Sequence, residues 1–257
     1  MSETKEWEKV VVAGDFQIPD HDPNCVQLLL NFLKEETPDW FIINGDFLNL
    51  ATLSKYAVAP SEYTFIQEII SGKEILRQIR EAIPKAKIDY LEGNHEFRMR
   101  QFLINRAPEL YGVPELAIPF HLDLAKFNIN WHPVKDRLTK FSDNHIQVGD
   151  LWVGHWDLVR QHGAYTAKGL LDKKGVNLMQ NHVHRGGSTF RRFVDGRILG
   201  GWENFCMCNF DPAYVNNPDW LQGFSVIYHQ IGHKRFMVQQ IPIIDYEFFY
   251  GNKHYHL

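Results

Sequence analysis

Residues 10–17 (VVVAGDFQ) decide the fold, because four apolar side chains run directly into a glycine, an aspartate and a nearby glutamine. The pattern returns at residues 40–46 (WFIINGD) and at residues 88–95 (IDYLEGNH). A short apolar run that ends at glycine is typical of a strand buried on both faces. We therefore predict three buried strands, at residues 10–13, 40–43 and 88–91.

Helical patterns separate these strands. Asp22 followed by Pro23 is typical of a helix start, an N-cap and then proline at the first helical position. A longer helix is indicated by apolar residues on one face, namely Phe65, Ile69, Leu76, Ile79 and Ile83. Strands that alternate with helices are joined by crossover connections, so this half predicts a parallel sheet.

The second half is richer in strands. Apolar runs predict strands at residues 151–153, 176–179 and 236–244, and residues 164–174 predict a helix that Gly175 ends. Asp195-Gly196 is a hairpin signal. We expect one domain over residues 1–257, with two packed sheets flanked by helices. Parallel strands are expected in one sheet, and mixed or antiparallel strands in the other.

Composition narrows the class of protein. Hydrophobic residues make up 44% of the 257 residues and charged residues 23%, which fits a globular protein and excludes disorder as the dominant state. No apolar stretch is long enough for a membrane span, and the polar start is unlike a secretory signal. The three cysteines lack scaffold spacing and favour free thiols in the cytoplasm. A net charge of -4 argues against general binding of polyanions.

Five of the expected strands end in residue types that bind metals. In open α/β folds, sites form outside the carboxyl ends of the strands, so these side chains are expected to converge. Residues i and i+2 at a strand end share a side, which pairs Asp15 with Gln17 and His182 with His184. Carboxylates with imidazoles suit Mn, Fe, Zn or Ni. The candidates are Asp15, Gln17, Asp46, Asn94, His95, His155, His182 and His184.

Five blocks in this order resemble the calcineurin-like metallophosphoesterase superfamily: GDFQ (14–17), GDFLN (45–49), GNHE (93–96), GHWD (154–157) and NHVHR (181–185). The resemblance covers residues 10 to 205. The sequence around these blocks, such as EGNHEFRMR and WENFCMCNFDPAY, is more specifically similar to the bacteriophage and prophage branch of the superfamily.

The resemblance implies a four-layered α/β/β/α sandwich with a mixed central β-sheet pair. It also implies two divalent transition-metal ions, with Mn favoured and Fe, Zn, Ni or Mg as alternatives. Asp46 would bridge the two ions. His95 would face the substrate, either as general acid for the leaving oxygen or as an electrostatic stabiliser. The first site would use Asp15, Gln17 and His184, and the second site Asn94, His155 and His182.

The chain departs from the family pattern at three positions. Gln17 stands where histidine is usual, which predicts a weaker first site, and His21 or Asp22 could substitute for it. Asn49 replaces a supporting acidic residue. Asn181 replaces a glycine, which suggests a different loop with unchanged ligands.

Some assignments have structural alternatives. Asp15 and Asp46 could cap the helices that follow them, and His162 is a rival to His155. Arg98 and Arg185 are candidates for a clamp on the substrate phosphate, although a basic cluster can also be a solvated face.

The function expected from these features is hydrolysis of phosphodiesters, of the nuclease or phosphodiesterase type, by hydroxide generated between two metals. One alternative is a phosphomonoesterase that acts on nucleotides or phosphoproteins. The other is a non-catalytic metal-binding scaffold. The expected partner is a phosphate-ester substrate, with nucleic acid as a candidate and no membrane; no sequence feature indicates the oligomeric state.

Overall fold

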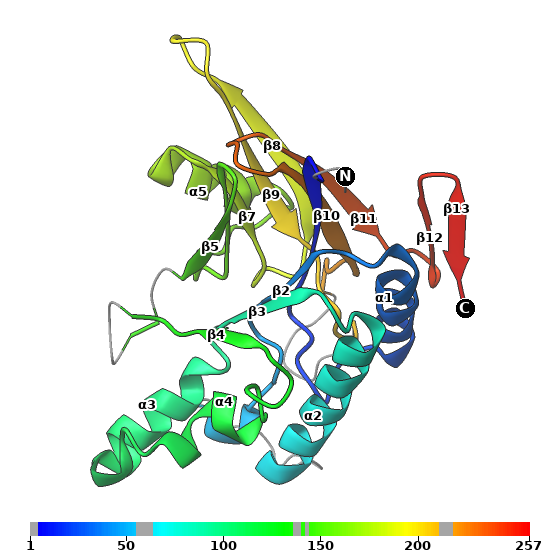
Figure 1. The fold of residues 1–257 in the computed structure, drawn as a ribbon. Coiled ribbons are helices and arrows are strands. Elements are labelled where there is room, and N and C mark those ends of the chain that lie inside the picture. Colours follow the sequence, from blue (N-terminus) through cyan, green and yellow to red (C-terminus); the bar gives the residue numbers. More distant parts are fainter. Residues whose placement is uncertain (1–4, 55–63, 136–139, 142–143, 211–217) are drawn as a thin grey trace.

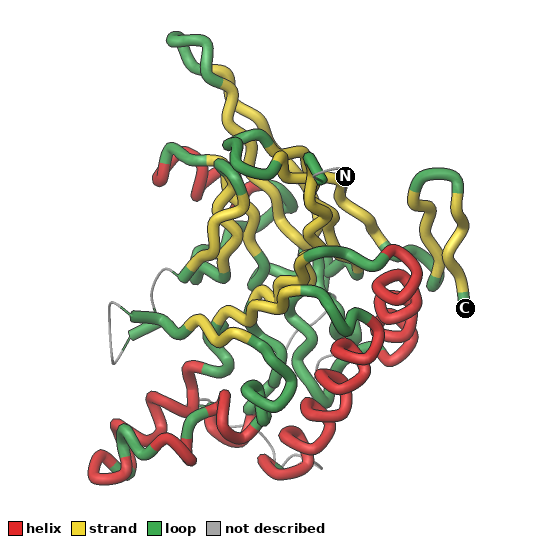
Figure 2. Tube along the Cα trace, viewed as in Figure 1, coloured by secondary structure: helices red, strands yellow, loops and turns green. Residues whose placement is uncertain are grey.

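Two mixed β-sheets lie face to face, with helices on their outer sides (Figures 1 and 2). The computed structural model describes residues 5–54, 64–135, 140–141, 144–210 and 218–257. The first sheet has the strand order β11 (Phe236–Pro242), β10 (Gly223–Gln230), β1 (Trp7–Ala13), β2 (Trp40–Asn44), β3 (Lys87–Leu91) and β4 (Asn130–His132). The second has the order β5 (His145–Val148), β6 (Leu151–Gly154), β7 (Asn177–Gln180), β9 (Ile198–Asn204) and β8 (Gly186–Arg192).

The apolar run of β1 serves two cores at once. Side chains alternate between the two faces of a strand, so Val10 and Val12 pack between the sheets, whereas Val11 and Ala13 pack beneath the helices. All four are fully buried. Because both faces of this strand are buried, its sequence does not alternate between polar and apolar residues.

Helices α1 (Pro23–Glu36) and α2 (Phe65–Ala82) cover the outer face of the first sheet (Figure 1). The predicted start of α1 is confirmed, because Asp22 Oδ1 accepts hydrogen bonds from the backbone amides of Asn24 and Cys25, at 2.9 and 3.1 Å. The start of α2 carries a capping box between Thr64 and Gln67.

Helix α5 (Tyr165–Lys174) covers the second sheet, and its Leu170 and Leu171 pack with Leu178 and Leu199 of the sheet. The helix ends at Gly175, as predicted, with a left-handed φ of 67°. Helix, sheet, sheet and helix therefore form four layers. This arrangement confirms the predicted α/β/β/α sandwich with a mixed sheet pair.

The expectation of one fully parallel sheet is wrong. Strands β1 to β4 are parallel, but β10 pairs antiparallel with β1 along Trp7–Val12, and β11 continues in the antiparallel sense. The run Gly223–Ile227 is buried throughout. Continuous burial predicts a central strand, but it carries no information on strand direction.

The remaining elements lie at the edges of the sandwich. Strands β12 (Glu247–Tyr250) and β13 (Lys253–His256) form a separate C-terminal hairpin, and the predicted Asp195-Gly196 turn joins β8 to β9. In the described part of the chain, no helix is long and apolar enough to cross a membrane. The shorter helices are α3 (Phe97–Arg106), α4 (Ile118–His121), η1 (Ala51–Leu53), η2 (Pro108–Leu110) and η3 (Pro114–Leu116).

Candidate metal centre

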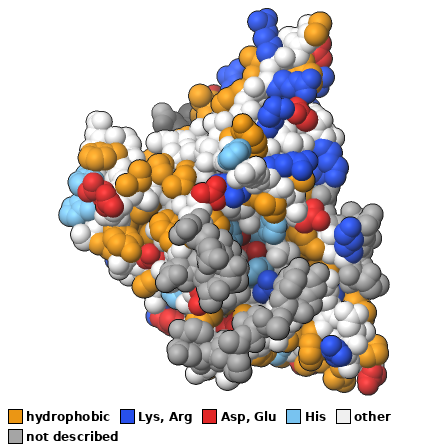
Figure 3. All heavy atoms as spheres, turned by 180° about the vertical axis from the view of Figure 1, so that it is seen from behind, with side chains coloured by type: hydrophobic (Ala, Val, Ile, Leu, Met, Phe, Trp, Pro, Cys, Tyr) orange, Lys and Arg blue, Asp and Glu red, His pale blue; other side chains and the backbone are white. Residues whose placement is uncertain are grey.

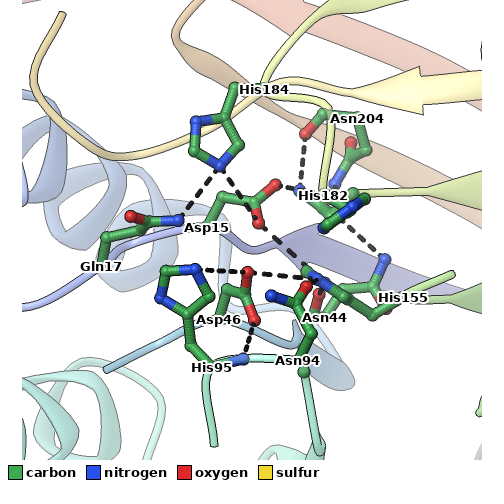
Figure 4. A network of polar contacts seen from close by, with 12 residues as sticks. Asp15, Gln17, Asn44, Asp46, Asn94, His95, His155, His182, His184 and Asn204 are labelled. Carbon is green, nitrogen blue, oxygen red and sulfur yellow. Dashed lines mark hydrogen bonds and ion pairs between the residues drawn. The ribbon is translucent and has the colours of Figure 1, made fainter. Parts of the chain in front are cut away.

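Five loops bring the predicted ligands together at one end of the sandwich (Figure 4). Each loop follows a strand that runs parallel to its neighbour, so the strand ends share an edge. The loops follow β1, β2, β3, β6 and β7, and they carry Asp15 with Gln17, Asp46, Asn94 with His95, His155, and His182 with His184.

One group of side chains is centred on Asp46. Potential ligand atoms of Asp46, His155 and His182 all lie within 4.8 Å of one another. His155 Nδ1 lies 2.8 Å from the carbonyl oxygen of Asn44, and its Nε2 lies 3.3 Å from Asp46 Oδ2 and 3.1 Å from Asn94 Oδ1. A carbonyl that accepts from one ring nitrogen leaves the other free to bind a metal, as metal-ligating histidines do.

A second group is centred on Asp15. His184 Nε2 lies 3.6 Å from Asp15 Oδ1 and 3.2 Å from Gln17 Nε2. Gln17 could ligate only through its amide oxygen, which a half-turn of the amide would bring to the same place. These two groups match the two predicted sets of ligands.

The loops hold these residues through an unusual backbone. Asp15, Gln17, Asp46, His182 and His184 all have φ between 49° and 84°, although none is glycine. Such conformations are strained for most residues and are concentrated at functional sites. Asp15 with Gln17 and His182 with His184 do face the same site, but the predicted reason is wrong. They lie beyond the strands, and left-handed turns orient them rather than strand alternation.

Two glycines leave room for the ligands. A Cβ on Gly93 would come within 2.2 Å of Asp46 Oδ1, and one on Gly45 would come within 2.6 Å of the His155 ring. The glycines of the GD and GNHE blocks are therefore required because ligand side chains pass where a Cβ would stand.

Burial and charge set the protonation of the two aspartates. Burial raises the pKa of Asp15 to about 8, although the charge of His155 opposes this rise. Burial also acts on Asp46, but its interactions with the imidazoles of His155 and His95 outweigh it and hold the pKa of Asp46 well below its ordinary value. Burial would lower the pKa of His155, yet Asp46 raises it to about 9. Asp46 and His155 therefore form a buried ion pair, and a cation bound by both residues would displace the proton of His155.

The donor set fits divalent cations. Burial lowers the pKa of His182 to about 4 and that of His184 to about 3, so both rings are neutral at pH 7 and keep a lone pair. Asp15 Oδ1 is buried and accepts no hydrogen bond from the described residues. A buried carboxyl oxygen without a donor, beside neutral imidazoles, is an arrangement that a cation would satisfy, and its binding would release the proton of Asp15.

His95 lies beside Asp46 without belonging to either group. Its backbone amide donates to Asp46 Oδ1 at 2.9 Å, and its Nε2 lies 2.9 Å from Arg98 Nη2. Arg98 Nη1 also donates to the carbonyl oxygen of Asn49, at 2.7 Å. Burial lowers the pKa of His95 to about 4. Since Arg98 can only donate, His95 Nε2 accepts, and the proton of the neutral ring sits on Nδ1.

The other predicted residues have different surroundings. Arg185 Nε pairs with Asp219 at 2.7 Å, and its Nη1 donates to the carbonyl oxygen of Arg160, so its charge is already engaged. The suggested substitute Asp22 is excluded as a ligand, because it caps α1 and accepts from Gln222 and Tyr246. The rival His162 is exposed and stacks edge-on against Tyr165.

Two supporting residues were not predicted as such. Glu96 accepts hydrogen bonds from the backbone amides of Asp46, Leu48 and Gly93, at 2.9–3.0 Å, and thereby fixes the loop that carries Asp46. Its place in the GNHE block was its only signal.

Asn181, which was predicted only to change a loop, links the ends of three strands. Its Oδ1 accepts from Asn44 Nδ2 at 2.8 Å and from Asn204 Nδ2 at 3.1 Å, so it joins the ends of β2, β7 and β9. The side chain is fully buried.

Two thiols form a further group behind His184. Cys208 Sγ lies 3.5 Å from His184 Nδ1, and ligand atoms of His184, Cys206 and Cys208 lie within 4.8 Å of one another. His184 thus faces Asp15 with one nitrogen and a thiol with the other. The sequence predicts these cysteines only as free thiols, because their spacing carries no known signal.

The fold is the sandwich of the metallophosphoesterases. The family model described as calcineurin-like phosphoesterase matches residues 8–196, and the chain belongs to this family. A search of curated protein sequences finds no significant match.

Several solved structures are similar to this chain at low sequence identity. Purple acid phosphatase PPD1 from yellow lupin is 15% identical, with a TM-score of 0.47 over 93% of this chain and 52% of that one. A single mutant of Vps29 from Entamoeba histolytica is 14% identical, with a TM-score of 0.45 over 92% and 93%. The phosphoesterase Yfce from E. coli is 11% identical, with a TM-score of 0.40 over 92% and 100%.

Proposed function

We propose that this protein hydrolyses phosphodiesters with the help of two divalent transition-metal ions. The observation that carries the proposal is the convergence of two ligand groups on the buried carboxylates Asp15 and Asp46. Membership of the calcineurin-like phosphoesterase family supports the class of reaction.

In this proposal, Asp15, Gln17 and His184 would hold one ion, and Asn94, His155 and His182 would hold the other. Asp46 would contribute its carboxylate to both. The mixture of oxygen and nitrogen donors favours Mn, with Fe, Zn, Ni or Mg as alternatives. Two such ions supply charge neutralisation on the phosphoryl oxygens and activation of water at neutral pH.

His95 acts on the substrate. The Nε2 of its ring faces Asp46 Oδ2 at 3.6 Å, and Arg98 holds the ring in this orientation. We assign this edge of the ring to the leaving oxygen, where it stabilises the developing charge or transfers a proton. Glu96 keeps the Asp46 loop in place during the reaction.

The charges around the site favour a diester over a monoester. A monoester dianion carries one more negative charge than a diester and benefits from an additional free cation. Among the described residues, Arg185 is paired with Asp219, and Arg98 is committed to His95 and Asn49. Neither predicted arginine therefore offers an unengaged guanidinium to a second phosphate charge.

Origin and location belong to the same proposal. We assign the chain to the bacteriophage and prophage branch because of the sequence in and around its motifs. We assign it to the cytoplasm, where its three buried thiols would stay reduced.

The test compares bis-p-nitrophenyl phosphate with p-nitrophenyl phosphate, with Mn added and after chelation. We expect faster hydrolysis of the diester, loss of activity on chelation, and recovery with Mn. Asp15→Asn should abolish activity, whereas the matched control Asp195→Asn, at an exposed turn, should not. Faster hydrolysis of the monoester would contradict the diester assignment. Metal binding without hydrolysis of either ester would identify the scaffold alternative.

A further inference from the structure

Positive charge is segregated in one short part of the chain. Residues 165–197 contain seven Lys and Arg side chains and only two aspartates, although the whole chain has a net charge of -4. The remaining residues therefore carry a marked acidic excess. The net charge of the whole chain does not reveal this basic segment. A polyanion is attracted by the local electrostatic potential rather than by the net charge.

Six of these seven side chains lie on α5 or on a projecting hairpin. Strands β8 and β9 extend beyond the sandwich as a hairpin, which we call the β8–β9 arm (residues 186–204), and α5 packs beside it (Figure 1). Arg191 Nη1 on β8 pairs with Asp172 Oδ1 on α5 at 2.7 Å. Figure 3 shows Lys and Arg side chains gathered along this arm, on the face where histidines lie in the central hollow.

Part of this charge is unengaged. Arg192 and Lys173 are exposed and have no acidic partner among the described residues. Arg191 and Arg197 lie over the Phe193 ring, with guanidinium carbons 4.7 and 5.3 Å from its centroid, and they pair with Asp172 and Asp195.

Exposed apolar side chains stand among these charges. The ring of Phe190 packs edge-on against Trp202 at 5.5 Å and still keeps 62% of its surface exposed. Val194, at the tip of the arm, is fully exposed. Aromatic rings interleaved with basic side chains are the usual surface for single-stranded nucleic acid, whose bases stack while its phosphates are neutralised.

The arm begins at the candidate metal centre. β8 starts at Gly186, two residues after His184, and runs to Arg192. Seven residues of strand cover about 23 Å at a rise of roughly 3.3 Å per residue. At the rise of about 3.4 Å per nucleotide of one strand in a stacked helix, that length corresponds to roughly seven phosphates.

We propose that the β8–β9 arm and α5 bind the backbone of a single-stranded nucleic acid and guide it to the metal centre. This inference rests on the proposed diesterase function, and it identifies the diester as a nucleic acid strand. A small diester would contact only the metal centre. An arm that extends about 20 Å from the centre can instead bind a polymer with regularly spaced negative charges.

The test measures binding of a fluorescein-labelled 15-mer oligothymidine with phosphorothioate linkages, which keep the charge and resist hydrolysis. Fluorescence anisotropy is recorded with the metal-loaded protein at several salt concentrations. The variant Arg192→Gln with Lys173→Gln removes two exposed charges that have no protein partner. The matched control is Lys85→Gln with Lys126→Gln, which removes the same charge from exposed positions outside the arm.

We expect the arm variant to bind about tenfold more weakly at low salt. Its slope of log K against log salt should be smaller by about 1.4, because each lost phosphate contact contributes about 0.7. The control should change neither. Equal losses in both variants, no binding by the wild type, stronger binding of a duplex, or equal competition by polyglutamate would each overturn the inference.

Hydrolysis of bis-p-nitrophenyl phosphate by the wild-type protein separates the two proposals. Hydrolysis without oligonucleotide binding would overturn only the role of the arm. Oligonucleotide binding that is lost in the arm variant, without hydrolysis of the small diester, would support the arm and overturn the diesterase function.

Discussion

Gln17 is the residue at which the candidate centre departs most from its family's pattern. Its amide lies 3.2 Å from His184 Nε2, so it occupies the position that the sequence assigned to it. An amide oxygen binds late first-row metals more weakly than an imidazole nitrogen does. We therefore expect the ion held by Asp15, Gln17 and His184 to be the more easily lost of the two.

Gln17→His should tighten this first site and shift its preference toward Zn or Ni. Calorimetric titration of both forms with Mn and Zn measures the change. In the wild type, two affinities should be resolved, and dilution or a mild chelator should empty the weaker site first. Equal affinities that the substitution leaves unchanged would show that Gln17 is not a ligand. His21 would then be the next residue to test.

His95→Asn should lower kcat by roughly 10²–10⁴-fold. The metal content should stay unchanged, because His95 contacts Asp46 and Arg98 rather than completing either ligand group. The readouts are steady-state kinetics with the diester and elemental analysis of the variant. His254→Asn, at an exposed position of the C-terminal hairpin, is the control. A variant that loses metal together with activity would make His95 a ligand instead.

Sequence patterns predict candidate ligands that directly follow a strand better than they predict the residues that hold those ligands in place. Asp15, Asp46 and His155 each follow an apolar run, so their convergence could be inferred from strand order alone. Glu96 and Cys208 act on partners far away in the chain, at Leu48 and His184. No local pattern encodes such contacts, because the fold alone brings the partners together.

The same limit applies to whole elements. Helix α5 (Tyr165–Lys174) corresponds to the helix predicted at residues 164–174, but its first turn has no local cap. Instead, the buried Glu203 on β9 accepts hydrogen bonds from the backbone amides of Ala164, Thr166 and Ala167, at 2.8–3.1 Å. A carboxylate at a helix N-terminus also complements the helix dipole. The direction of β10 was likewise fixed by tertiary packing.

Asp89 stabilises the edge of the first sheet in a pH-dependent way. Burial would raise its pKa, but hydrogen bonds from His132, Lys87 and Asn130 lower the pKa to about 2. A carboxyl whose folded pKa lies below its unfolded value of about 4 stabilises the protein above that value. This contribution is lost as the pH falls from about 4 to about 2.

Asp89→Asn should therefore reduce the free energy of unfolding by about 2 kcal/mol at pH 7. The difference from wild type should shrink as the pH falls below about 4. Urea denaturation at several pH values measures both, with Asp150→Asn, a surface carboxyl, as the control. A difference that does not depend on pH would contradict this account of β3 and β4.

At the scale of the whole molecule, two mixed sheets direct five strand ends to one place and extend a basic arm from it. The apolar runs specified the sheets, and the residue after each run specified the candidate ligands. Charge segregation is visible in the sequence, but its projection on an arm beside the ligands is visible only in the fold (Figures 1 and 3). In the proposed diesterase, the strand ends supply the candidate metal ligands, and the arm supplies the positive charges that would bind the nucleic acid strand.

Metal stoichiometry is the measurement that tests the central claim most directly. Elemental analysis of the purified protein after incubation with Mn should find close to two ions per chain. Asp46→Asn removes the proposed bridging charge and should lower that number markedly, whereas the exposed control Asp195→Asn should retain both ions. Absence of bound metal in the wild type after incubation with Mn would contradict the assignment of these residues as a dinuclear centre.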